Sequence, residues 1–249
     1  MHIEVVGRGP ALVLIHGWAL HGGVFAPLVE RLQDQFELHL IDLPGHGHSC
    51  EDPTALRLPQ VVNAIAAATP PAVWCGWSLG GLFALHGAAV VPKVRGLVMI
   101  AATPRFVRGE DWPHAVEPAV FAQFGQVLAL DAMGSEHARQ ELRTLRAALV
   151  ERGEPAPRAL QEGLALLENT DLRGALPALR KPSLWLAGKR DRLVNARGMQ
   201  AAAALSPGAQ AEVIEHGGHA PFLGHADIVA AQLRQFVVES SRLSVDSTR

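Results

Sequence analysis

The feature that most constrains the fold is an alternation, along the chain, of short apolar segments with helical patterns. This alternation is typical of a parallel β-sheet covered on both faces, because the crossover between two parallel strands is usually a helix. We therefore predict an α/β fold with a mostly parallel, doubly wound sheet. The expected strands are His2–Val6, Ala11–Ile15, Glu37–Ile41, Ala72–Cys75, Val94–Ile100, Ser183–Leu186 and Ala211–Ile214.

Helical patterns separate most of these strands, and one long stretch has no strand pattern at all. From residue 105 to 179 only helical patterns occur, and an insertion there would form a cap over the strand ends, where ligands bind in open α/β folds. We predict a core of residues 1–104 and 180–240, a helical cap of residues 105–179 and a frayed tail at 241–249. The expected core helices are about Val24–Gln33, Leu58–Ala67, Leu79–Val90, Gly198–Ala204 and Ala226–Ser240. A separate helical domain is the alternative to a cap.

Charge and composition exclude several classes of partner. A formal net charge of −2 argues against nucleic acid as the main partner. No apolar run reaches the roughly 18 residues of a membrane span, and no signal peptide is indicated at Met1, so we expect a cytoplasmic protein with no membrane partner. A monomer is expected. Cys50 and Cys75 are interpreted as two free thiols in a reducing compartment.

The segment Gly76-Trp77-Ser78-Leu79-Gly80 matches the Gly-x-Ser-x-Gly pattern that presents a nucleophilic serine on a sharp turn from strand to helix. An apolar strand pattern precedes it and an almost wholly apolar helix pattern follows it, as that turn requires. Ser78 would then lie at a helix N-terminus, where free N–H groups favour an anion. The sequence thus predicts covalent catalysis by Ser78.

A serine needs a base and an orienting acid to act as a nucleophile. In sheets with this turn the chain order is serine, acid, histidine. Asp191 and His219 follow the last two expected strands and would leave the sheet at the same edge as Ser78. We predict that His219 moves the proton and that Asp191 orients the imidazole. A solvated Asp191 paired with neighbouring basic residues is the alternative, with Glu110, Asp111 and Asp171 as substitute acids.

The intermediate of such a reaction needs two N–H donors for its oxyanion. Leu79, directly after the serine, is one candidate. Trp18, in the loop after the strand Ala11–Ile15, is the other, and its indole would line the pocket. A purely structural Trp18 is the alternative.

His46 and His48 form an H-x-H pair without acidic or cysteine ligands at zinc-site spacing, so we predict no metal site.

These segments together resemble a known superfamily. The α/β-hydrolase superfamily is indicated over nearly the whole chain by His16-Gly17-Trp18, residues 42–49, the Ser78 turn, Asp191 and His219-Ala220-Pro221-Phe222. Within it, the chain resembles the pimeloyl-acyl-carrier-protein methyl ester carboxylesterases of biotin synthesis. That resemblance is carried by residues 76–82, Glu110-Asp111-Trp112-Pro113, Leu128-Ala129-Leu130, Met133-Gly134 with Ala138-Arg139-Gln140, and Thr170-Asp171-Leu172-Arg173.

The resemblance implies a reaction, a partner and a set of substrate contacts. The reaction is hydrolysis of the methyl ester of a pimeloyl chain tethered to acyl carrier protein, without a cofactor. Besides Trp18, Leu79 and His219, the implied substrate-binding residues are Val127, Leu128, Ala129, Leu130 and Asp131. Val127 and Asp131 depart from the phenylalanine and glutamine of the family pattern, and the preceding part of the cap is shorter.

An acidic carrier protein calls for a basic docking surface. Arg139, Arg143 and Arg146 fall on one face of an expected helix, and Arg158 opens the next. The alternative is that these arginines form a solvated helix face and pair with neighbouring acidic residues.

For the whole protein, the competing hypotheses are a broad carboxylesterase for short free acyl esters and, more remotely, a hydrolase fold that binds without catalysis.

Overall fold

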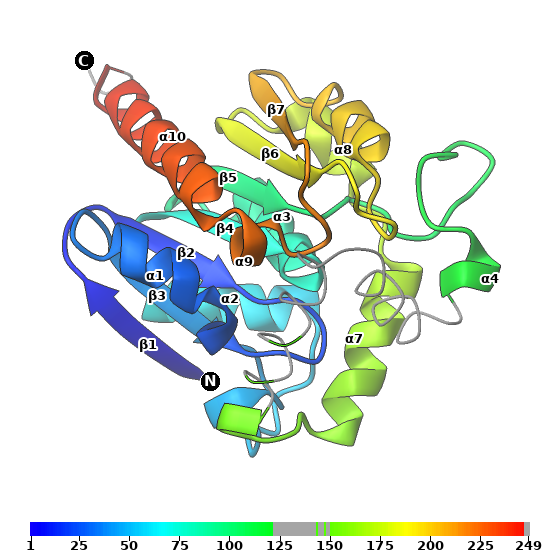
Figure 1. Cartoon of the computed structure of the whole chain (residues 1–249), viewed down its shortest axis with the longest axis horizontal. Helices are drawn as coiled ribbons and strands as arrows, with labels where there is room; N and C mark the ends of the chain where they lie inside the picture. The colour runs from blue at the N-terminus through cyan, green and yellow to red at the C-terminus, as the bar shows by residue number, and fades with distance from the viewer. Residues whose placement is uncertain (122–142, 144–146, 148–149, 247–249) are drawn as a thin grey trace.

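The computed structural model describes the whole chain except residues 122–142, 144–146, 148–149 and 247–249. A seven-stranded sheet with the strand order β1-β3-β2-β4-β5-β6-β7 forms its centre (Figure 1). Only β1 runs antiparallel to its neighbour, so the predicted mostly parallel sheet is confirmed. The strands are β1 (His2–Gly7), β2 (Ala11–Ile15), β3 (Glu37–Asp42), β4 (Ala72–Trp77), β5 (Val94–Ile100), β6 (Ser183–Gly188) and β7 (Ala209–Ile214).

Helices cover both faces of the sheet. They are α1 (Ala26–Leu32), α2 (Leu58–Ala68), α3 (Leu79–Val90), α4 (Pro118–Phe121), α7 (Pro157–Asn169), α8 (Ala196–Ala203), α9 (Pro221–Gly224) and α10 (Ala226–Asp246). Short 3₁₀ helices occur at η1 (Gly22–Phe25), η2 (Gly47–Ser49) and η3 (Arg173–Ala178). The 3₁₀ helix η1 occupies the start of the helix predicted from Val24.

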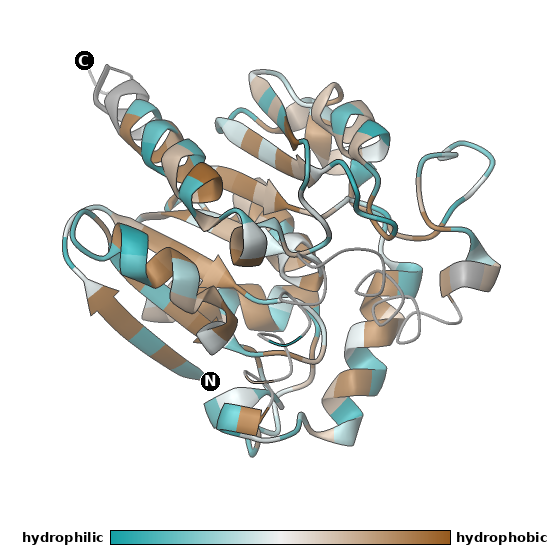
Figure 2. Ribbon diagram, in the orientation of Figure 1, coloured by the Kyte–Doolittle hydropathy of each residue, from teal (hydrophilic) through white to brown (hydrophobic). Residues whose placement is uncertain are grey.

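Two apolar layers hold the helices on the sheet. Alternate residues of β2 point to opposite layers: Leu12 and Leu14 belong to the layer that includes α1 and α10, whereas Val13 and Ile15 belong to the layer that includes α2, α3 and α8. This alternation follows from the two-residue period of a strand. Figure 2 shows the central strands mainly in the apolar colour, while α7 carries both colours. The helix α3 is buried on nearly all sides, as its almost wholly apolar sequence predicts.

The C-terminal helix differs from its prediction. It was expected to end at Ser240, but α10 continues to Asp246. The six added residues contain neither glycine nor proline, the two residues that oppose helix most strongly. Extending an existing helix is much easier than starting one, so polar residues do not end it.

The stretch from residue 105 to 179 has no strand among its described residues, apart from isolated bridges that pair Val107 with Val116 and Gly109 with Trp112. Its main described element is α7, which lies beyond the arrowhead end of the central strands in Figure 1. Ala159 and Leu167 of α7 join the same apolar layer as α3. This stretch therefore extends the core beyond the carboxyl edge of the sheet, where parallel-sheet proteins bind ligands.

Candidate active site

Ser78 lies on the sharp turn between β4 and α3. Its backbone has φ 53° and ψ −120°, a strained conformation for a residue with a side chain. The turn is tight because glycines flank it: a methyl group at Gly76 would overlap the backbone of Gly80, and one at Gly80 would overlap the carbonyl oxygen of Ile15. The Gly-x-Ser-x-Gly spacing is therefore a steric requirement of this turn.

The three residues predicted for catalysis lie within hydrogen-bond distance of one another. Ser78 Oγ is 2.9 Å from His219 Nε2, and His219 Nδ1 is 2.8 Å from Asp191 Oδ2. A carboxylate only accepts hydrogen bonds, so Nδ1 carries the ring proton and Nε2 can accept the serine proton. The three side chains come from loops after β4, β6 and β7, and all three are buried.

Asp191 and His219 are held by contacts that sequence patterns do not reveal. Asp191 Oδ1 accepts the N–H groups of Leu193 at 2.8 Å and Val194 at 2.9 Å, which leaves Oδ2 for the histidine. The indole of Trp77, the residue before the serine, donates to the carbonyl oxygen of His219 at 2.7 Å and packs against Phe222. Trp77 thus ties the strand that carries the serine to the loop that carries the histidine. A tryptophan inside the serine motif was the only sequence sign of this.

The loop that carries Trp18 is packed directly against the serine. A methyl group at Gly17 would lie 3.2 Å from Ser78 Cβ and 3.0 Å from the Trp77 ring. Leu79 is the first residue of α3, and the first N–H groups of a helix have no partner within it. Both residues predicted to donate to an oxyanion therefore belong to segments that border Ser78.

His16 fixes the start of this loop. Its Nδ1 donates to the carbonyl oxygen of Gly17 at 2.7 Å, and its Nε2 accepts the N–H of Leu43 at 3.0 Å. Burial, with a contribution from the neighbouring His46, lowers the pKa of His16 to about 3, so the ring is neutral at pH 7. A neutral ring is required by the bond to Leu43, because only an unprotonated nitrogen accepts. In the sequence, His16 stood out only as part of the segment His16-Gly17-Trp18, and no pattern indicated this structural role.

The helix α7 packs over the same loop. Trp18 Nε1 donates to the carbonyl oxygen of Leu160 at 2.9 Å. A methyl group at Gly163 would lie 2.8 Å from Trp18 Cδ1 and 3.2 Å from Leu79 Cδ2. Close approach at Gly163 thus brings α7 onto both residues predicted for the oxyanion hole.

Other contacts extend this interface along the loop after β3. Ala156 donates its N–H to Gly45 at 2.8 Å, and the Glu162 carboxylate accepts the N–H of Leu56 at 2.8 Å. We call the contacts of residues 152–163 with the core the α7 seam. It joins a segment that is distant in sequence to the loops that surround Ser78.

Several predicted residues of the insertion lie outside the described residues. They are the substrate-binding candidates Val127, Leu128, Ala129, Leu130 and Asp131 and the docking candidates Arg139 and Arg146. Arg143 is described and exposed. Arg158 lies in the α7 seam, where its guanidinium bonds to the Glu162 carboxylate and to the carbonyl oxygens of Asp52 and Thr54.

Two of the substitute acids are engaged elsewhere. Asp111 and Asp171 both bond to Arg173 at 2.7 Å, and Arg105 contacts both carboxylates. The bond to Arg173 lowers the pKa of each carboxyl below its ordinary value. These residues connect the two ends of the insertion, and Asp191 is the carboxylate on His219.

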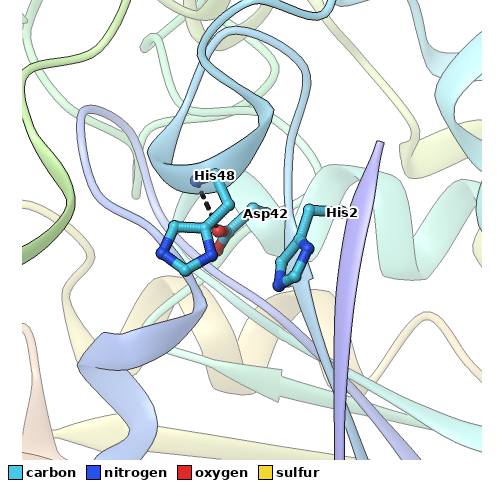
Figure 3. A group of neighbouring side chains, drawn as sticks. All are labelled: His2, Asp42 and His48. Atoms are coloured by element: carbon cyan, nitrogen blue, oxygen red, sulfur yellow. Dashed lines mark hydrogen bonds between the residues drawn. The ribbon is translucent and has the colours of Figure 1, made fainter.

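One group of side chains has the composition of a metal site. Potential ligand atoms of His2, Asp42 and His48 lie within 4.8 Å of one another (Figure 3). However, Asp42 already accepts the N–H groups of Gly22 and His48, and the Arg152 guanidinium contacts both of its oxygens at 3.5 and 3.3 Å. A guanidinium in this position opposes a second cation, so the donor set does not suit a metal ion.

Comparison with known proteins agrees with this architecture. The sequence profile of a family described as the alpha/beta hydrolase family matches residues 12–232. The chain belongs to the α/β hydrolase family. A solved esterase from Exiguobacterium antarcticum has the same fold, with a TM-score of 0.81 and 21% identity over 95% of this chain and 94% of that one. The predicted fold class is therefore confirmed.

Two relatives are much more similar in sequence to this α/β hydrolase. A protein from Stenotrophomonas maltophilia named pimeloyl-[acyl-carrier protein] methyl ester esterase is 76% identical over 97% of this chain and 98% of its own length. A protein of the same name from Xanthomonas oryzae pv. oryzae is 68% identical over 95% and 98%. The resemblance stated from sequence motifs is thus confirmed over almost the full chain.

Within the described residues, no helix combines the length and apolarity needed to cross a bilayer.

Proposed function

We propose that this α/β hydrolase is a serine carboxylesterase that hydrolyses the methyl ester of a pimeloyl chain carried on acyl carrier protein, in biotin synthesis. The observation that carries the proposal is 76% identity, over 97% of the chain, to a protein named for this reaction. The hydrogen bonds that link Ser78 to His219 and His219 to Asp191 support the proposal, because such a triad activates a serine for acyl transfer.

In the proposed mechanism, Ser78 Oγ attacks the ester carbonyl carbon while His219 Nε2 takes the hydroxyl proton. Asp191 stabilises the imidazolium that results, and the N–H groups of Trp18 and Leu79 hold the oxyanion. As the carbon–oxygen bond to the methoxy group breaks, His219 returns the proton and methanol leaves. A water molecule, deprotonated by His219, then hydrolyses the acyl-enzyme and restores Ser78. No step needs a metal or an organic cofactor.

Substrate selection is assigned to the insertion. Together with Trp18, Leu79 and His219, residues 127–131 are proposed to contact the acyl chain. Arg139, Arg143 and Arg146 are proposed to attract the acidic carrier protein. Arg158 is the weakest docking candidate of the four, because its guanidinium bonds to the core and its side chain is 41% exposed.

The triad is tested by replacing Ser78 with alanine. Turnover of both methyl pimeloyl-acyl-carrier protein and a short p-nitrophenyl ester should fall by about 10⁶-fold, as in other serine triads. The melting temperature should not fall, because the change removes only an oxygen and one hydrogen bond. A variant that keeps substantial turnover would show that Ser78 is not the nucleophile.

Carrier recognition is tested by comparing kcat/KM for methyl pimeloyl-acyl-carrier protein and the short ester. Reversing two charges in Arg139→Glu/Arg143→Glu should lower kcat/KM for the tethered substrate by 10-fold or more and leave the short ester within about twofold, because rim charges act mainly on association. Arg8→Glu/Arg95→Glu is the matched control, since these exposed residues lie between β1 and β2 and in β5, away from the carboxyl edge. Equal use of both substrates, insensitive to either double variant, would refute carrier specificity.

A further inference from the structure

Arg152 is an arginine at the end of a helical segment, residues 150–152, and its side chain is turned into the core. The guanidinium bonds to Glu4 at 2.6 Å and contacts Asp42 at 3.3 Å, and the side chain is only 9% exposed. Asp42 has no exposed surface. This ion pair therefore connects a residue within the insertion to the buried carboxylate at the C-terminal end of β3.

Asp42 holds both segments that flank it. Its Oδ1 accepts the N–H of Gly22 at 2.7 Å, and its Oδ2 accepts the N–H of His48 at 2.9 Å. Gly22 ends the loop that begins at His16 and contains Trp18. Because His16 bonds to Leu43, the residue after Asp42, both ends of the Trp18 loop are attached to the end of β3. The position of Asp42 thus determines where the two ends of the Trp18 loop lie.

The charge of Arg152 matters because Asp42 is buried. Burial alone would raise the pKa of Asp42, but the N–H groups of Gly22 and His48, with smaller contributions from His16 and Arg152, lower it below its ordinary value. His16 is neutral at pH 7, so Arg152 supplies the full positive charge that faces this carboxylate among the residues described above. Without it, a buried anion would lack a counter-charge, and the carboxylate would be drawn toward water.

Arg152 also touches the loop side of Asp42. A methyl group at Gly23, next to Gly22, would lie 3.3 Å from Arg152 Nε. The guanidinium therefore packs against the backbone at the start of η1. It also packs against the Asp42 carboxylate, which binds the N–H of Gly22 in the same segment. A change at Arg152 would reach the Trp18 loop by two routes, through Asp42 and through this backbone contact.

We propose that Arg152 is a positioning residue for the oxyanion hole: by holding Asp42, it fixes the loop from His16 to Gly22 and couples the seating of residues 150–163 to the placement of the Trp18 N–H. The inference rests on the proposed assignment of Trp18 to the oxyanion hole. Its effect should appear in the transition state, where the oxyanion forms, and much less in substrate binding.

The test uses Arg152→Met, which keeps most of the side-chain volume and removes the charge, in the full-length protein. With p-nitrophenyl acetate, kcat per active site should fall by about 10-fold or more, while KM changes by less than about twofold. Active sites are counted by stoichiometric reaction with a phosphonate, so misfolded protein does not enter kcat. The Ki of a trifluoromethyl ketone, which forms a tetrahedral oxyanion adduct, should rise in parallel with the fall in kcat/KM.

Arg173→Met is the matched control. Arg173 is also a largely buried arginine, 17% exposed and bonded to two carboxylates, but it lies near the C-terminal end of the insertion and its carboxylate partners are Asp111 and Asp171. It should lower the melting temperature yet leave kcat per active site and the ketone Ki within twofold of wild type. Arg152→Lys, which restores the charge, should recover part of the loss.

The outcomes separate a positioning role from a structural one. A lowered melting temperature in Arg152→Met with unchanged kcat per site and unchanged ketone Ki would overturn the proposal. If Arg152→Met does not fold, Arg152→Lys decides it, because the shorter lysine side chain carries a single-point cation and should still weaken ketone binding by threefold or more. The short ester needs no carrier protein, so this test stands even if methyl pimeloyl-acyl-carrier protein is not a substrate.

Discussion

The turn around Ser78 and the α7 seam both border the active site, but they are held in different ways. At the turn, backbone lies against backbone: neither Gly76 nor Gly80 leaves space for a methyl group. In the seam, side chains from a distant segment reach the core through separate bonds, such as those of Arg158 to Asp52 and Thr54. We therefore expect one substitution in the turn to cause a large loss of stability. Each substitution in the α7 seam should lower the free energy of unfolding by a smaller amount.

The largest effect is expected for Gly80→Ala. The new methyl group would overlap the carbonyl oxygen of Ile15, and neither backbone can move without disturbing β2 or α3. The free energy of unfolding should fall by about 4 kcal/mol or more, or no folded protein should be obtained. Gly174→Ala, where nothing lies within 4 Å of the new methyl group, should leave it nearly unchanged. Urea unfolding measures both, and a Gly80→Ala protein as stable as wild type would contradict the steric argument.

A large effect is also expected from acid acting on His16. Burial lowers its pKa from 6.5 in the unfolded chain to about 3 in the folded protein, so between these values the unfolded chain binds more protons. Stability from this group is complete above pH 6.5 and is lost as the pH falls toward 3, with a slope approaching about 1.4 kcal/mol per pH unit.

The His16 prediction is measured by urea unfolding at several pH values. His16→Gln keeps a donor and an acceptor but cannot be protonated, so its stability should fall less steeply with acid. Some slope should remain, because burial also lowers the pKa of the neighbouring His46. Parallel curves for the two proteins would assign the acid sensitivity to other groups.

Gly163→Val tests the close approach of α7 to the Trp18 loop in the α7 seam. Added atoms would meet the Trp18 indole and Leu79, whose side chains can shift at some cost, so a loss of about 1–3 kcal/mol in the free energy of unfolding is expected. Activity should fall as well, because Trp18 moves. Ala165→Val, at an exposed position of the same helix, is the control and should cost only about 0.5 kcal/mol from helix propensity. Equal losses in the two variants would mean that close approach at Gly163 does not matter.

The smallest effect is expected for Arg158→Ala. Its side chain is 41% exposed, so water can replace the bonds to Glu162 and to the two carbonyl oxygens. The free energy of unfolding should fall by no more than about 1 kcal/mol. Thermal unfolding at low and high salt provides the measurement. A loss as large as that of Gly163→Val would show that the polar bonds of the seam matter as much as its packing.

The sequence predicted the fold well where a pattern reflects local geometry. The strands Ala11–Ile15 and Val94–Ile100 and the helix Leu79–Val90 have the predicted bounds, because their apolar residues are set by burial on the sheet. The helix α10 passes its predicted end because polar composition was taken as an end signal, although no helix-breaking residue stands there. Ser78, Asp191 and His219 could be proposed together because parallel strands bring their following loops to one edge.

Contacts between distant segments could not be predicted in this way. The bond of Trp77 to His219 spans 142 positions, and that of Arg152 to Asp42 spans 110. No periodicity or motif distinguishes Arg152 from the arginines proposed for docking, and Arg158 was assigned to a partner while its guanidinium bonds to the core. Such pairs depend on which distant segments of the chain pack against each other in the folded protein.

The sequence by itself determined the sheet, the order of the catalytic candidates and the steric need for glycine around Ser78, because each of these follows from the local period or from backbone space. Only the tertiary structure decided how the Trp18 loop is held. His16, Asp42 and Arg152 are far apart along the chain, and their roles arise from burial. Burial keeps the His16 ring neutral. It also removes the Asp42 carboxylate from water, so this carboxylate needs the Arg152 guanidinium as a counter-charge.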